Sequence, residues 1–129
     1  MTPPRPPFLD ADWRARLATR LVEDPEFAHV ARWCNVAVEL SCAEGSARLV
    51  LSSGQLEPDG ATTGHPQVRV HAPAERWAAF FSAAPPAWHN DLLGLARRHS
   101  DVDLDTGGQT LVRHLRALNR MWEVARAAH

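Results

Sequence analysis

The sequence of 129 residues contains no lysine, no tyrosine and no isoleucine. Each of its 14 permanently charged basic residues is therefore an arginine. Without lysine no Schiff-base chemistry is available, and without tyrosine no phenol can serve as an acid. Acid–base work would have to fall on histidine, aspartate or glutamate. The three missing residues have A/T-rich codons, so their absence indicates a bacterial genome of high GC content.

Cysteine is also scarce, with Cys34 and Cys42 as the two examples. They stand on one predicted strand, where their Cα atoms would lie about 26 Å apart. A disulfide needs a separation of roughly 4.4–6.8 Å. We therefore expect both to be small core residues in a reducing compartment, which predicts a cytoplasmic protein.

Strong charge and long apolar runs are missing as well. The formal net charge is −1, which gives no general attraction to nucleic acid or to an anionic membrane surface. No apolar run has the length of a membrane helix, so no stable membrane insertion is expected. The first residues, Met1 to Pro7, lack the apolar core of a signal peptide.

Metal and cofactor motifs are absent from the sequence. None of the seven histidines stands three or four residues from another, as zinc-binding helices require. Gly107-Gly108 precedes a predicted helix without a glycine-rich phosphate fingerprint, and it is typical of a strand-to-helix turn. We predict no metal and no cofactor.

The chain divides into a proline-rich tail and one domain. Residues 1–9 contain four prolines and are expected to be a mobile tail, and residues 10–129 form the domain. Asp10 predicts the start of a helix over about 11–22, and Asp24-Pro25 predicts the start of a second, short one.

Hydrophobic periodicity then changes from helical to alternating. Four strands are expected, beginning at Trp33, Ala47, Gln55 and Val68, and their short connections predict a mainly antiparallel sheet. Two helices, a strand over 101–105 and a closing helix over about 109–127 follow. The order α-α-β-β-β-β-α-α-β-α predicts an α+β fold with about five strands and helices on one face.

Residues 85–95 combine titratable and apolar groups. Pro85-Pro86 is expected to end one helix and to start the next, which would run to about Arg98. Trp88, His89 and Asp91 would then lie in its first turn, beside a leucine-rich face. Residues two apart on a helix do not face each other, so His89 and Asp91 would meet only in an irregular turn.

The element order and several turns resemble the sterol carrier protein type two (SCP2-like) domain over about residues 10–127. The matching features are the hairpin of residues 45–54, Val68-Arg69-Val70 followed by Trp77, and the last strand with its glycine turn and leucine-rich helix. One departure is Gly108-Gln109, where the family often has Gly-Asp. The resemblance implies a curved sheet whose helices enclose an apolar tunnel for acyl chains, sterols or similar ligands.

Large apolar residues of the later helices fit either a ligand cavity or a close-packed core. With the resemblance, about half of them are expected to touch a ligand, and His89 is expected to bind its polar end. The predicted ligand-binding set is Trp77, Phe80, Phe81, Trp88, His89, Leu92, Leu115, Leu118 and Trp122.

Three hypotheses follow. The leading one is a binding or carrier protein for a hydrophobic small molecule such as a lipid, sterol or polyketide-like compound. The second is an enzyme (a cyclase, isomerase or hydrolase) that uses the same cavity, with His89 as acid or base and Asp91 orienting it. The third is a partner-binding domain that forms a homodimer through an apolar helix face.

Overall fold

A five-stranded sheet organises the fold. The computed structural model describes residues 5–57, 60, 64–87, 89–105 and 109–127. Its strands run in the order β3-β2-β1-β4-β5. Their bounds are β1 (Val36–Cys42), β2 (Gly45–Ser52), β3 (Gln55–Glu57), β4 (Gln67–His71) and β5 (Asp103–Asp105).

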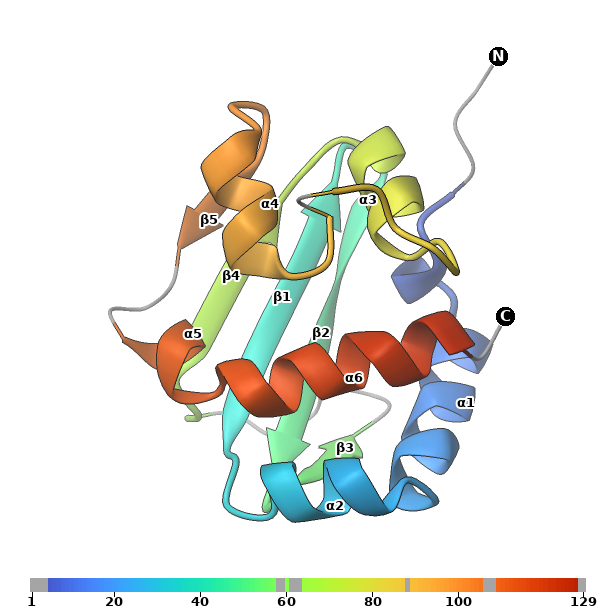
Figure 1. Ribbon diagram of the computed structural model, residues 1–129, viewed down its shortest axis with the longest axis vertical. Coiled ribbons are helices and arrows are strands. Elements are labelled where there is room, and N and C mark those ends of the chain that lie inside the picture. Colours follow the sequence, from blue (N-terminus) through green and yellow to red (C-terminus); the bar gives the residue numbers. More distant parts are fainter. Residues whose placement is uncertain (1–4, 58–59, 61–63, 88, 106–108, 128–129) are drawn as a thin grey trace.

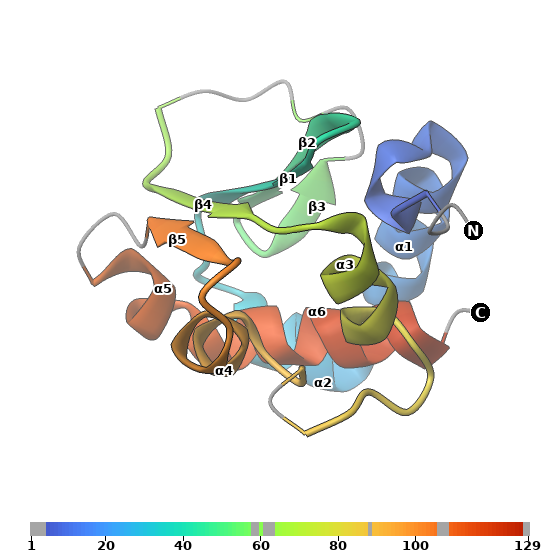
Figure 2. The same cartoon turned by 90° about the horizontal axis from the view of Figure 1, so that it is seen from above.

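Helices cover one face of this sheet, as Figure 2 shows from above. They are η1 (Pro7–Leu9), a 3₁₀ turn, and α1 (Ala11–Val22), α2 (Pro25–Ala31), α3 (Ala74–Phe80), α4 (Leu92–Arg98), α5 (Thr110–Arg113) and α6 (Leu115–Ala127). The predicted α+β class and one-sided helical cover are therefore confirmed. None of the helices in the described part of the chain is long and apolar enough to span a bilayer.

Side-chain caps start the first two helices where the sequence predicts them. The Asp10 carboxylate accepts a hydrogen bond from the Asp12 N–H at 2.9 Å, and α1 begins at the next residue. Asp24 accepts one from the Phe27 N–H at 2.8 Å, with Pro25 in the first turn of α2. Each cap satisfies one backbone donor that a helix start leaves without an intrahelical partner.

The strands β1 to β3 form an antiparallel meander. Residues 43–44 join the first two strands, in register with Cys42 opposite Gly45. Ser53 and Gly54 join the next two with positive φ angles of 49° and 77°, the backbone of a tight hairpin turn. A Cβ at Gly54 would lie 2.4 Å from the Ala31 carbonyl oxygen, so this turn requires glycine.

The pairing of β1 with β4 is parallel, with Val38 opposite Val68. The β4–β5 pair is antiparallel, so the sheet is mixed although mostly antiparallel. Hairpin-length connections alone did not reveal the parallel pair, because β4 returns to the free edge of β1 after a longer connection.

Alternation along the strands separates a buried face from a mixed one. Val38, Leu40 and Leu51 are fully buried beneath the helices. The opposite face exposes Arg69 and carries the half-buried Glu39 beside it. Ala37 and Val50, paired across this second face, are also buried, so it is less polar than the alternation predicts.

Cys34 and Cys42 are free thiols, as predicted, and both are buried. Cys34 precedes β1, because the strand begins at Val36 rather than at Trp33. Burial raises the pKa of the Cys34 thiol, because a thiolate would be poorly solvated there.

The start of the domain lies earlier than residue 10. Residues 7–9 form η1, and the side chain of Phe8 has no exposed surface. The Phe8 carbonyl accepts a hydrogen bond from the Arg14 guanidinium at 2.7 Å. The expected tail therefore does not include these residues, because Phe8 belongs to the core; residues 1–4 lie outside the described residues.

The closing helix is interrupted, contrary to the prediction of one continuous helix. His114 separates α5 from α6, with backbone angles of φ −107° and ψ 9°. Its N–H donates to the carbonyls of Thr110 and Leu111, which ends the short first helix. The apolar spacing of four and three residues continues across this break, so periodicity could not reveal it.

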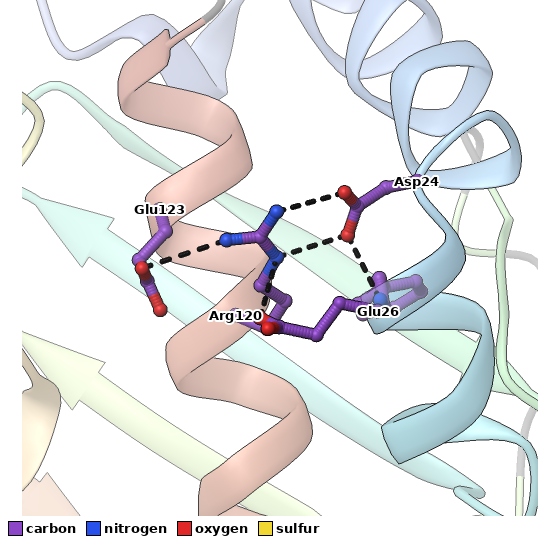
Figure 3. A network of polar contacts seen from close by, with 5 residues as sticks. Asp24, Glu26, Arg120 and Glu123 are labelled. Carbon is purple, nitrogen blue, oxygen red and sulfur yellow. Dashed lines mark hydrogen bonds and ion pairs between the residues drawn. The ribbon is translucent and has the colours of Figure 1, made fainter.

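An ion-pair network joins α2 to α6 (Figure 3). The Arg120 guanidinium donates to both carboxylate oxygens of Asp24, at 2.8 and 2.9 Å. Glu26 lies 2.9 Å from the same guanidinium, and Glu123 lies 3.6 Å from it. Arg120 of α6 therefore connects this helix to the start of α2. The hydrogen bonds from Arg120 hold the pKa of Asp24 below its ordinary value.

Candidate functional site

Aromatic rings fill the space between α3, α6 and the first turn of the domain. Three rings contact one another with centroids 5.0–6.1 Å apart. They belong to Trp77 and Phe80 of α3 and to Phe81, its C-terminal cap. Trp122 of α6 meets Phe80 at 5.3 Å and Phe81 at 6.0 Å, both edge to face. Four residues of the predicted ligand-binding set are thus brought together.

Two residues outside the predicted ligand-binding set complete the aromatic cluster. Phe8 meets Trp77 edge to face at 5.3 Å, and Trp13 meets Phe81 at 5.5 Å. All six rings are buried. Edge-to-face geometry suits aromatic rings, because the positive ring edge meets a negative ring face.

The Trp77 indole is fixed by a backbone acceptor. Its Nε1–H donates to the carbonyl of Ser41 in β1 at 2.9 Å. This bond attaches α3 to the sheet and satisfies the polar atom of a fully buried ring. Trp77 is therefore an anchor for the aromatic cluster.

The connection between α3 and α4, residues 81–91, contains no helix or strand among its described residues. Figure 1 shows it between the yellow α3 and the orange α4. The predicted second helix does not begin at Pro85-Pro86 but at Leu92. Asp91 has extended backbone angles and caps the helix, so the helix cannot extend further back.

His89 and Asp91 consequently have separate partners. The Asp91 carboxylate accepts a hydrogen bond from the Gly94 N–H at 2.6 Å. His89 is 6% exposed, and its Nδ1 lies 3.1 Å from the carbonyl oxygen of Ala87. A carbonyl only accepts, so Nδ1 is the donor in this hydrogen bond. Trp88, also predicted to bind ligand, lies outside the described residues.

Arg126 fastens this connection to α6. Its Nε donates to the Phe80 carbonyl at 2.7 Å, and one Nη donates to the carbonyls of His89 and Asn90 at 3.0 and 2.9 Å. The guanidinium also lies 4.8 Å from the centre of the Phe80 ring. Burial lowers the pKa of Arg126, with Glu123 and Asp91 opposing that effect. No signal in the sequence indicates this role, because an arginine near a helix C-terminus is ordinary.

The rings of His89 and His99 are neighbours, with centroids 4.6 Å apart. His99 caps the C-terminus of α4. Burial lowers the pKa of His99, electrostatic interaction with Arg76 and His89 lowers it further, and Asp101 opposes these effects. This histidine pair brings together two residues ten positions apart that no sequence motif connects.

The predicted leucines divide between the core and its margin. Leu92 and Leu118 are fully buried in the main core, whereas Leu115 at the start of α6 is half-buried. Outside α4, a surface groove is lined by Asp91, Leu93, Arg97 and neighbouring residues.

A sheet with helices on one face, closed over an aromatic interior, is the architecture of SCP2-like domains. No family model matches this sequence, and no curated protein matches it. Among solved structures, a sterol carrier protein 2 has a TM-score of 0.65 at 16% identity, covering 89% of this chain and 94% of its own.

Two further solved structures have the same architecture. A conserved hypothetical protein from Thermus thermophilus, described as a possible sterol carrier protein, has a TM-score of 0.66 at 14% identity. It covers 98% of this chain and 93% of its own. A ubiquinone synthesis protein titled UbiJ-SCP2 has a TM-score of 0.59 at 18% identity, covering 95% of this chain and 94% of its own. The chain has the SCP2-like fold, as the sequence resemblance predicts.

Proposed function

We propose that this chain binds a hydrophobic small molecule between its helical layer and its sheet, as a carrier or binding protein. The observation that carries the proposal is the convergence of Trp77, Phe80, Phe81 and Trp122 beneath a connection without regular structure. The titles of two structural neighbours, a sterol carrier protein and a possible one, support it.

Displacement of residues 81–91 gives a route into this interior. Arg126 holds the connection through the neutral carbonyls of His89 and Asn90, and the described residues of the connection form no helix or strand that would have to unfold. An apolar ligand that replaces the displaced surface gains roughly 25 cal/mol per Å² of apolar area removed from water. Ligand binding and opening of the connection are therefore coupled.

Native mass spectrometry of gently purified protein, followed by titration with palmitate, palmitoyl-CoA and cholesterol, tests the proposal. Tryptophan fluorescence reports binding, because Trp77 and Trp122 lie in the aromatic cluster. We expect Phe81→Leu to change the affinity several-fold. Val112→Leu, at a residue that is 63% exposed, is the matched control and leaves it unchanged. Absence of binding to all three compounds contradicts the proposal, and the same spectra report whether the chain is a homodimer.

The second candidate is an enzyme acting on an apolar intermediate in the same interior. The observation that favours it is the His89 ring, whose Nδ1 is held by the Ala87 carbonyl so that Nε2 is available as a base. Asp91 caps α4 through one carboxylate oxygen, so in this function its other oxygen would orient the imidazole. His89→Gln that retains ligand affinity but loses turnover supports this function, and unchanged turnover removes His89 from the mechanism.

A further inference from the structure

Three polar side chains occupy one face of α6. Asn119, Trp122 and Arg126 are separated by three and four residues, so they lie above one another on the helix. Trp122 contacts the Phe80 ring at 5.3 Å between centroids, and Arg126 contacts the same ring at 4.8 Å. We call these three residues the polar stripe; its members Trp122 and Arg126 pack against α3, and Arg126 also binds the connection that follows α3.

The members of the polar stripe differ in their hydrogen bonding. Arg126 donates to three backbone carbonyls, as described above. The Trp122 Nε1–H and the Asn119 Oδ1 are both closed to solvent, and neither has a hydrogen-bond partner among the residues that the structure describes. The whole Trp122 side chain has no exposed surface. A buried donor or acceptor without a partner is costly, so both groups favour a guest that can pair with them.

The two groups are chemically complementary to one kind of ligand group. The indole N–H only donates, and the amide oxygen only accepts. A hydroxyl can accept from the first and donate to the second at the same time. A ketone or ether oxygen can satisfy only the indole, and a carboxylate would also repel the amide oxygen.

We propose that the hydrophobic molecule bound by this chain carries an uncharged hydroxyl group, held between Trp122 and Asn119. This inference rests on the proposed function, because it names the ligand class for the same interior. The apolar body of the ligand would lie among the aromatic rings, and its hydroxyl would lie against α6. The principal alternative is a buried water that pairs with both groups and confers no preference on the ligand.

Matched ligands of equal chain length test the hydroxyl directly. We expect 1-dodecanol to bind the wild-type protein about tenfold more tightly than dodecyl methyl ether or dodecanoate, as one additional buried hydrogen bond allows. Asn119→Leu, which keeps a side chain of similar size, should remove the preference of the alcohol over the ether. Val112→Leu is the control, because this residue of α5 is 63% exposed and the variant should leave the preference intact.

A spectroscopic measurement on the wild-type protein tests the same proposal without requiring that a variant folds. Bound dodecanol should move the indole ¹⁵N–¹H resonance of Trp122 downfield, whereas that of Trp77 stays in place. Trp122→Phe assigns the resonance by its disappearance. An indole resonance of Trp122 that does not respond to bound dodecanol would overturn the inference.

The outcomes separate this inference from the proposed function. Equal affinities for the alcohol, the ether and the carboxylate overturn the hydroxyl preference, as a structural water predicts, and leave hydrophobic binding intact. An alcohol preference that survives Asn119→Leu overturns the assignment to the polar stripe. Failure of all three compounds to bind overturns both proposals.

Discussion

Two arginines of α6, six positions apart, hold the molecule together in different ways. Arg120 pairs with the carboxylates of Asp24 and Glu26 at the start of α2, and with that of Glu123 on α6 itself (Figure 3). Arg126 is 8% exposed and donates to three backbone carbonyls. One arginine therefore connects two regular helices through opposite charges, and the other secures an irregular segment through neutral acceptors.

This difference indicates which part of the structure is fixed and which part can open. Asp24 is also the N-cap of α2, so its carboxylate serves the helix and the ion pair together. Of the three carbonyls bound by Arg126, that of Phe80 ends α3, whereas those of His89 and Asn90 belong to the connection, whose described residues form no helix or strand. We expect α2 and α6 to stay together while residues 81–91 exchange between closed and open positions.

Of the substitutions that test this difference, Arg126→Met should lower the unfolding free energy most. The variant removes three charge-assisted hydrogen bonds from buried carbonyls, so we expect the unfolding free energy to fall by about 3 kcal/mol. Hydrogen exchange should show lost protection in residues 81–91 before α2 is affected. Arg116→Met, at an exposed position of the same helix, is the control. Unchanged protection of the connection would contradict the role of Arg126.

Substitutions of Asp24 should have the next largest effect. Asp24→Ala removes both the cap and the ion pair and should cost about 2 kcal/mol in urea unfolding. Asp24→Asn keeps a capping oxygen but loses the charge, so about half of that loss is expected. Equal losses in the two variants would show that the ion pair contributes nothing.

Acid should weaken the Asp24–Arg120 ion pair between α2 and α6 before it affects the hydrogen bonds of Arg126. The pKa of Asp24 is lowered by hydrogen bonding to Arg120, so its stabilising contribution is complete above its unfolded value of 3.8. That contribution is lost as pH falls below 3.8 toward the lowered pKa. Urea unfolding at a series of acidic pH values should show that the unfolding free energy of Asp24→Asn declines less steeply with falling pH than that of the wild-type protein. Equal declines of the unfolding free energy in the two proteins would contradict the lowered pKa of Asp24.

The smallest effect is expected at the end of α4. The pKa of His99 is lowered, first by burial and then by electrostatic interaction with Arg76 and His89. Protonation therefore favours less folded states, and the contribution of neutral His99 is lost as pH falls from its ordinary value of 6.5 toward the lowered one. Hydrogen exchange of α4 at about pH 7.5 and about pH 5.5, on either side of the ordinary histidine range, should show a modest loss of protection that is absent in His99→Gln.

Local signals in the sequence predicted much of the fold. Asp10 and Asp24 marked two helix starts because a cap acts on its own neighbours, and the turn at Gly54 is likewise local. Alternation located the strands for the same reason. The parallel β1–β4 pair and the break at His114 were not predicted, because both depend on contacts or angles that leave the apolar spacing unchanged.

The candidate site was predicted in its apolar part and not in its polar part. Large side chains at helical spacing predicted Trp77, Phe80 and Trp122 as ligand-binding or core residues; the structure packs them in one aromatic cluster, and ligand binding by them stays a prediction. Arg126, Asn119 and Phe8 were not predicted, since an arginine, an asparagine and a phenylalanine acquire their roles from partners distant in the chain. His89 and Asp91 are close in sequence, yet the structure gives them separate hydrogen-bond partners, Ala87 and Gly94.

The parallel contact between β1 and β4 also divides the chain into two contiguous halves. In the sheet order, β3, β2 and β1 of the first half lie on one side of this contact, and β4 and β5 of the second half lie on the other. Two separately produced fragments, cut between β3 and β4, would have complementary open edges at β1 and β4. The SCP2-like fold of this chain is therefore suited to fragment complementation, with reassembly restoring the sheet and the Asp24–Arg120 ion pair together.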